Sequence, residues 1–143
     1  MKVKQISVFL ENKYGRLAAV TRLLADHGIN IRALSIADTS DFGILRLIVN
    51  QPEEAYQVLK INSFTVSMTE VIGVEIPDQP GGLAEVLEVL GQANINIEYL
   101  YAFLGRWHNG ALVIFRVEQV EKAIAVLAAN GVVTVAGEKL YSM

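Results

Sequence analysis

Apolar and polar residues alternate along the first stretch of the chain, with Ile6, Val8 and Leu10 on one side. This period of two is typical of a strand with one buried face. The apolar residues that follow recur at helical spacing up to residue 27, and Gly28 stands where a helix end favours a positive φ. The pattern predicts, in order, a strand at 2–10, a helix at 15–27, strands at 30–38 and 44–50, a helix that begins at Pro52 and a strand at 64–67.

The second half of the chain repeats the first. Residues 72–102 match residues 6–36 at eleven positions when shifted by 66, whereas chance gives about two in such a window. The shared residues, numbered in the first copy, are Ile6, Val8, Gly15, Leu17, Ala18, Val20, Leu24, Ile29, Asn30, Ile31 and Leu34. The chain therefore contains a tandem duplication, with a first domain predicted at 1–68 and a second at 69–143.

The second copy predicts the same order of elements. These are strands at 70–76, 96–104, 111–117 and 132–136, and helices at 81–93 and 118–130. Hairpin turns are predicted at 38–43 and at the Asn109-Gly110 pair, and the tail "EKLYSM" is predicted as an additional edge strand. The fold class is therefore α+β, with two tandem ferredoxin-like βαββαβ units whose antiparallel sheets carry helices on one face.

The strand entries contain a break in parity. Ile29 and Ile31 stand at odd-numbered positions, whereas Leu34 and Ile36 stand at even-numbered ones. The second copy shows the same switch. This predicts a bulge at 32–33 and at 98–99.

The second copy also carries an aromatic face that the first lacks. Tyr99, Tyr101 and Phe103 stand where the first copy has Ala33, Ser35 and Ala37. Two interpretations are open for this face: packing against the other copy or a second chain, or a ligand pocket lined by Tyr99 or Tyr101. Trp107 in the adjacent turn is a candidate interface edge.

Composition narrows the classes of function. Hydrophobic residues make up 52% and charged residues 19%, which supports a substantial core. The net charge of −3 argues against nucleic acid or an anionic membrane as the main partner. There are no cysteines, which excludes disulfides, zinc-thiolate sites and thiol nucleophiles. The sequence shows neither a signal peptide nor a membrane span, so we expect a cytoplasmic protein.

The sequence offers little catalytic chemistry. His27 stands at a helix C-terminus and His108 in a turn, while Asp38 and Asp41 fit turn chemistry. Two distant histidines without cysteines give no metal-ligand spacing, and the chain has no nucleophile elbow or phosphate-binding loop. We expect no catalytic residues, no metal and no cofactor, and a small enzyme stays only as a residual alternative.

The duplicated loop before the first helix of each copy carries more information. Asn12 and Asp78 each precede a glycine, Gly15 or Gly81, by three residues. One interpretation is a helix N-cap. The other is an anion site at the helix N-terminus, which suits the carboxylate of a free amino acid, while an asparagine oxygen accepts from its ammonium group.

These motifs resemble those of the ACT domain family. "DQPGGL" at 78–83 and "NKYGRL" at 12–17 are similar to the family's Asn/Asp-x-Pro-Gly-x-Leu loop, and "HGINI" and "ANINI" to its strand entry. The resemblance covers the chain as two tandem copies and implies regulatory binding of amino acids between two ACT units. The residues it implies as ligand-binding are Asn12, Gly15, Arg16, Leu17, Asn30, Asp78, Gly81, Gly82, Leu83 and Asn96.

Three departures from the family pattern bear on these sites. Tyr14 replaces the usual proline, Asn94 replaces a glycine, and Asp78 brings a negative charge near the expected carboxylate. We therefore expect the two sites to differ in affinity.

We expect a regulatory protein that binds an amino acid without catalysis. The alternative is an interaction subunit that docks on a metabolic enzyme, with or without a ligand. The expected partners are an amino acid, a second copy of the chain in a homodimer, and an unidentified enzyme.

Overall fold

The computed structural model describes residues 2–38, 41–108 and 110–142. It divides into two compact units. We call Lys4–Thr69 with Tyr141–Met143 the first-copy unit, and Met1–Val3 with Glu70–Leu140 the second-copy unit. Both predicted hairpin turns include residues outside the described ranges.

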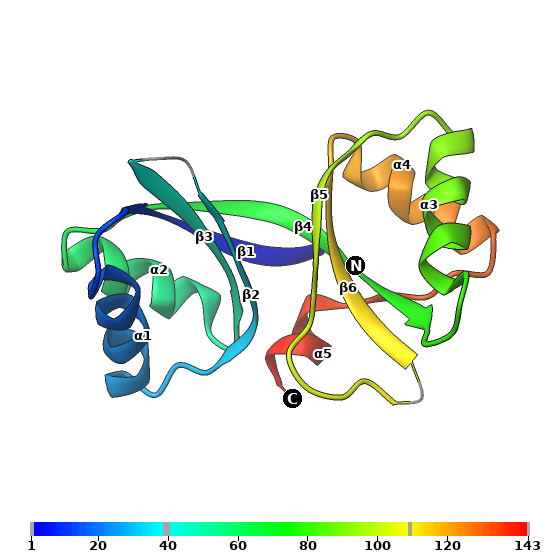
Figure 1. Ribbon diagram of the computed structural model, residues 1–143. Coiled ribbons are helices and arrows are strands. Elements are labelled where there is room, and N and C mark those ends of the chain that lie inside the picture. The colour runs from blue at the N-terminus through cyan, green and yellow to red at the C-terminus, as the bar shows by residue number, and fades with distance from the viewer. Residues whose placement is uncertain (1, 39–40, 109, 143) are drawn as a thin grey trace. The chain divides into compact units, whose positions relative to one another are not determined.

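The first-copy unit is an antiparallel sheet covered on one face by two helices (Figure 1). Strand β3 pairs with β1 and with β2, and the strand order is β2-β3-β1-β4. Its elements are β1 (Lys2–Glu11), α1 (Arg16–Asp26), β2 (Ile31–Asp38), β3 (Phe42–Val49), α2 (Pro52–Ile61) and the first part of β4 (Thr65–Pro77). Its core includes Ile6, Val8, Leu24, Leu45 and Leu59, all fully buried.

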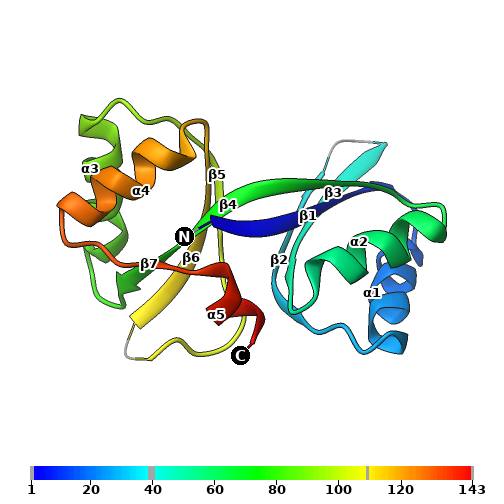
Figure 2. The same ribbon diagram turned by 180° about the vertical axis from the view of Figure 1, so that it is seen from behind.

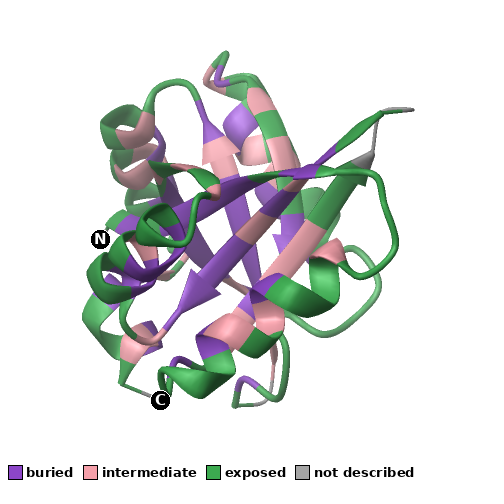
Figure 3. Cartoon of the chain, turned by 90° about the vertical axis from the view of Figure 1, so that its left-hand side faces the viewer, coloured by how far each residue is buried: buried purple, intermediate pink, exposed green. Residues whose placement is uncertain are grey.

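The second-copy unit repeats this arrangement, as seen from behind in Figure 2. Its strand order is β7-β4-β6-β5, with the later part of β4 in the place of a first strand. Its other elements are α3 (Gly82–Gln92), β5 (Ile97–Ala102), β6 (Gly110–Val117), α4 (Val120–Ala129), β7 (Thr134–Val135) and α5 (Gly137–Tyr141). The structure confirms the predicted α+β class. In Figure 3 burial concentrates on strands, while loops and outer helix faces are exposed.

The predicted irregularity at each strand entry is confirmed. The pairing of β2 with β3 shifts between Ile31 and Ala33, and that of β5 with β6 shifts between Ile97 and Tyr99. Each shift leaves one residue out of the ladder, Arg32 or Glu98, and thereby reverses the faces of the residues that follow. Ile31 before the shift and Leu34 after it consequently both pack against the helix-facing core of the first-copy unit.

The prediction of an edge strand at the C-terminal tail is wrong, because residues 137–141 form the short helix α5. Leu140 of this helix is fully buried, and its Cδ1 lies 3.4 Å from where a Cβ on Gly73 would be. Leu112 and Ile114 surround the same point, on the face of the sheet opposite α3 and α4. Because Gly73 has no side chain, Leu140 packs directly over it, and the helical turn of α5 brings Leu140 to this position.

The N-cap interpretation of Asn12 and Asp78 is also wrong. The N-cap positions of α1 and α3 are Gly15 and Gly81, in left-handed conformations with φ of 88° and 87°. Asn12 and Asp78 therefore lie three residues before the caps.

No helix in the described residues is long and apolar enough to cross a membrane.

Candidate ligand-binding sites

The loop before α1 is a tight turn that presents the start of the helix. The Asn12 amide donates to the Asp41 carbonyl (2.9 Å), and the Arg16 amide to the Lys13 carbonyl (3.4 Å). Lys13 forms an ion pair with Glu11 at 2.9 Å, and this hydrogen bond lowers the pKa of the Glu11 carboxyl. Lys13 is therefore already paired, which leaves Arg16 as the cation at the first position of the helix.

The Arg16 side chain does not extend into solvent from the helix start. Its guanidinium carbon lies 4.9 Å from the centre of the Phe64 ring, in a cation–π arrangement. Its Nε is buried, while Phe64 packs against the first-copy core. The side chain thus fills the space between the start of α1 and the segment that follows α2.

The loop before α3 has the same backbone but different side chains. Gly81 holds the N-cap, and Gly82 takes the place of Arg16. A Cβ on Gly82 would lie 2.2 Å from the Pro77 carbonyl oxygen, so only glycine fits. Asp78 is exposed.

The strand entries combine a buried isoleucine with an exposed asparagine. Ile29 and Ile95 are each 4% exposed, and their amides donate to the carbonyls of Leu24 and Leu90 at 2.9 and 3.0 Å. Asn30 and Asn96, which follow them, are exposed. The isoleucines close the core of each unit, and the asparagine side chains are directed away from it.

The backbone of Asn30 is fixed from β3. Its amide donates to the Asn50 side-chain oxygen (2.9 Å), and the Asn50 amide donates to the Asn30 carbonyl (3.1 Å). These two bonds hold the strand entry in place while the Asn30 side chain stays exposed.

The structure does not bring all predicted residues of one copy together. Asn12 and Gly15 precede α1, whereas Asn30 follows it, and this helix has 11 residues. At 1.5 Å per residue the helix separates the two motifs by about 16 Å. The same holds for α3, which has 11 residues between the glycine loop and Asn96. Leu17 and Leu83 in the first helical turns are 40% and 38% exposed.

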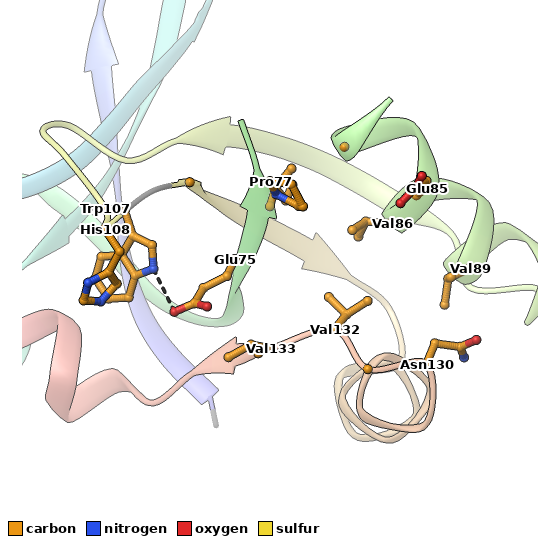
Figure 4. A pocket seen from close by; sticks show the side chains of 14 residues that line it. Glu75, Pro77, Glu85, Val86, Val89, Trp107, His108, Asn130, Val132 and Val133 are labelled. Atoms are coloured by element: carbon orange, nitrogen blue, oxygen red, sulfur yellow. Dashed lines mark hydrogen bonds between the residues drawn. The ribbon is translucent and has the colours of Figure 1, made fainter. Parts of the chain in front are cut away.

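A pocket of about 540 Å³ opens in the second-copy unit, where β4 ends (Figure 4). Of the residues predicted to bind ligand, Gly82 lines this pocket. A second hollow of about 420 Å³, which Trp107 also lines, includes Asp78. The residues that line the first pocket are Glu75, Ile76, Pro77, Gly82, Glu85, Val86, Val89, Trp107, His108, Gly110, Asn130, Gly131, Val132 and Val133.

Trp107 forms one wall of this pocket and is 3% exposed. Its indole Nε1 donates to the Glu75 carboxylate (2.9 Å), and its ring meets Phe103 edge-on at 6.0 Å. The interpretation of Trp107 as an interface edge is therefore wrong, because the ring is buried within its own unit. The sequence signal that was missed is Glu75, the acceptor that lets an indole be buried.

The two tyrosines of the aromatic face lie outside both hollows, whereas Phe103 lines the smaller one. Tyr101 is 7% exposed and stacks on Tyr99 at 6.4 Å between ring centres, and neither ring lines either hollow. The interpretation of these tyrosines as pocket residues gains no support. His108, in contrast, is exposed and lines both hollows.

The remaining polar candidates have local roles. His27 is the C-cap of α1, and its Nδ1 lies 2.9 Å from the Leu23 carbonyl oxygen. Asp41 is exposed, and the side chain of Asp38 lies outside the described residues. Among the described residues, no group of three His, Asp or Glu side chains is placed to hold a metal ion.

Comparison with known proteins agrees with this architecture. A sequence model of the ACT domain pair matches residues 1–143. A solved structure of a Bacteroides thetaiotaomicron protein is 45% identical, with a TM-score of 0.93 over 100% of this chain and 98% of that one. No curated protein is similar enough in sequence to count as a relative.

A more distant structure shares the fold. The ligand-free regulatory subunit of aspartate kinase from Thermus thermophilus is 16% identical, with a TM-score of 0.65 over 88% of this chain and 91% of that one. Both the duplicated glycine loops and the full-length match lead to one conclusion: the chain belongs to the ACT domain pair family.

Proposed function

We propose that the protein is a regulatory module that binds a free amino acid at the glycine loops and the asparagine strand entries. The observation that carries the proposal is the pair of left-handed glycines, Gly15 and Gly81, at the starts of α1 and α3. The first backbone amides of a helix have no acceptor within it, and the helix dipole favours an anion there. The Arg16 and Gly82 amides already donate to the carbonyls of Lys13 and Gln79, so the donors for a ligand carboxylate are the amides that follow them in each first turn.

The ammonium group of the ligand needs acceptors of a different kind. The exposed side chains of Asn30 and Asn96 supply amide oxygens. Because α1 and α3 separate these asparagines from the glycine loop of their own copy by about 16 Å, the loop and the asparagine of one copy do not contact the same small ligand.

The two helix starts are not equivalent. The first carries the cation Arg16, whereas the second carries Gly82, with Asp78 exposed in the preceding loop. The positive charge of Arg16 attracts a ligand carboxylate, whereas the negative charge of Asp78 repels it. We therefore expect the tighter site at Gly15 and Arg16.

Thermal unfolding with each amino acid tests the proposal. A ligand that binds only the folded state raises the melting temperature, by an amount that grows with concentration. Asn30→Ala and Asn96→Ala should each reduce this shift while changing the ligand-free melting temperature little, because both side chains are exposed. Asn62→Ala, at the exposed C-cap of α2, is the matched control and should keep the full shift. The absence of a shift with every amino acid at about 10 mM contradicts the proposal.

A second candidate function is an interaction subunit. It is favoured by two large apolar side chains on the open face of the first-copy sheet, Phe9 and Phe42, which are 47% and 56% exposed. Exposed apolar groups that gather in this way mark association sites. Phe9→Asp should then abolish a stable oligomer or enzyme complex in size-exclusion chromatography, and an unchanged elution profile contradicts this function.

A further inference from the structure

The pocket in the second-copy unit has a specific origin in the duplication. Arg16 and Gly82 are the first residues of α1 and α3, and each follows a left-handed N-cap glycine. Phe64 and Val132 follow α2 and α4, and their amides donate to the carbonyls of Leu59 and Leu127 at 3.0 and 2.9 Å. These are equivalent positions in the two copies.

The first copy fills the space between these positions with its own side chains. The Arg16 guanidinium lies over the Phe64 ring at 4.9 Å. In the second copy Gly82 and Val132 both line the pocket. The space that Arg16 and Phe64 occupy in the first copy is therefore part of an open cavity in the second. A larger residue at position 82 cannot fill this cavity, because only glycine fits there.

The second copy also places carboxylates around this space. Glu75 stands where the first copy has Phe9, and Glu85 stands where it has Ala19. Figure 4 shows Glu75 on the Trp107 side of the pocket and Glu85 on α3, with Val86 and Val132 between them. The described residues that line the pocket include no lysine and no arginine. The cavity thus joins apolar walls to negative charge at neutral pH.

Both carboxylates keep acceptor capacity. The Glu75 Oε1 accepts from the Trp107 indole (2.9 Å), and an ionised carboxylate has further lone pairs on both oxygens. The Glu85 side chain is exposed on the first turn of α3. The buried Trp107 fixes Glu75, so this acceptor is positioned before a ligand arrives.

We propose that this pocket binds a small molecule with a guanidinium or ammonium group at the end of an alkyl chain. The alkyl chain packs on Val86, Val89 and Val132, the terminal cation is held by Glu75, and Glu85 on the other side of the valines adds negative charge to the pocket. The volume of about 540 Å³ lies within the range of small-ligand pockets. The site goes beyond the amino-acid sites proposed above, because it needs no carboxylate on the ligand and lies within one unit.

Isothermal titration calorimetry with three probes tests the class of ligand. Agmatine carries a guanidinium and an amine but no carboxylate, L-arginine carries a guanidinium and a carboxylate, and n-butylurea has a comparable alkyl chain with an uncharged urea in place of the guanidinium. We expect agmatine and L-arginine to bind and n-butylurea to leave the pocket empty. The proposal is overturned if agmatine does not bind at about 10 mM, or if n-butylurea binds as tightly as agmatine.

Four variants locate the site. Glu85→Gln should weaken agmatine binding about fivefold, and Glu75→Gln about tenfold, because the glutamine oxygen still accepts from Trp107 but the charge is lost. Val132→Phe restores the aromatic ring of the first copy and should weaken binding at least about tenfold by filling the pocket. Glu88→Gln, an exposed acid on the same helix that does not line the pocket, is the matched control and should bind as the parent does.

The outcomes separate this site from the amino-acid sites. Unchanged agmatine affinity in Glu75→Gln, Glu85→Gln and a folded Val132→Phe overturns the proposal, with folding checked by the melting temperature of each variant. Loss of agmatine binding in Asn30→Ala or Asn96→Ala also overturns it, because that would assign the ligand to the strand entries. Retained agmatine binding in those two variants supports it, even if no amino acid binds elsewhere.

Discussion

Leu140 is the contact by which α5 covers the open face of the second-copy sheet, and its removal tests that arrangement. The side chain is fully buried, against Gly73, Leu112 and Ile114. Replacement of a buried leucine by alanine costs about 2–5 kcal/mol. Because α5 has five residues and lies near the chain end, it can settle partly into the cavity. We therefore expect Leu140→Ala to lower the free energy of unfolding by about 2–3 kcal/mol.

The sequence provides its own probe for this measurement. Trp107 is the sole tryptophan, is 3% exposed and belongs to the same unit as Leu140. Its fluorescence during urea unfolding gives the midpoint and the slope, and we expect the midpoint to fall with the slope unchanged. Leu104→Ala is the matched control, since this leucine is 50% exposed and its truncation should cost less than about 0.5 kcal/mol.

A double-mutant cycle with Gly73 decides whether the leucine acts through the proposed contact. A Cβ on Gly73 would lie 3.4 Å from the Leu140 Cδ1, so Gly73→Val overpacks the site and should cost about 1–3 kcal/mol. In the Leu140→Ala background the added methyl groups fill the cavity, and the cost should fall or reverse. Effects that add within about 0.5 kcal/mol would refute the packing argument, as would a loss below 1 kcal/mol for Leu140→Ala alone.

Three further predictions follow from the geometry. Gly15→Ala and Gly81→Ala should each lower the free energy of unfolding by about 1–2 kcal/mol in urea titrations, because φ is 88° and 87° there, whereas Gly91→Ala should not. Asn50→Ala should cost about 1 kcal/mol in the same assay by removing the acceptor of the Asn30 amide, and a neutral result contradicts this role. The side-chain hydrogen bond from Lys4 lowers the pKa of Glu53, so its contribution to stability is present above the ordinary glutamate pKa and is lost as the pH falls through the lowered value. Glu53→Gln should therefore reduce stability at pH 7 and leave it unchanged near pH 2, in melts at both values.

Local patterns predicted most of the elements because the spacing of apolar residues within an element sets which of its faces is buried. The alternation of Ile6, Val8 and Leu10 places these side chains in the core, and the parity switch after Ile31 marks the shift in register. The duplication strengthened these predictions, since a pattern that occurs twice with the same spacing is unlikely to arise from composition alone.

The predictions that failed depend on contacts between residues distant in sequence. The tail "EKLYSM" has too few residues for its period to distinguish strand from helix, and the choice depends on Gly73, which lies 67 positions before Leu140. The burial of Trp107 likewise depends on Glu75, 32 positions away. The N-cap assignment failed because a left-handed glycine took the cap position itself.

The sequence by itself determined that the chain is a duplicated βαββαβ fold with glycine loops and asparagine strand entries, because periodicity and turn chemistry act between near neighbours. The tertiary structure decided that a helix separates the glycine loop from the asparagine strand entry within each copy, and that the second copy is open where the first is filled by Arg16 and Phe64. A cavity is the absence of side chains from a shared volume, so it becomes visible once residues from several elements have been placed around it.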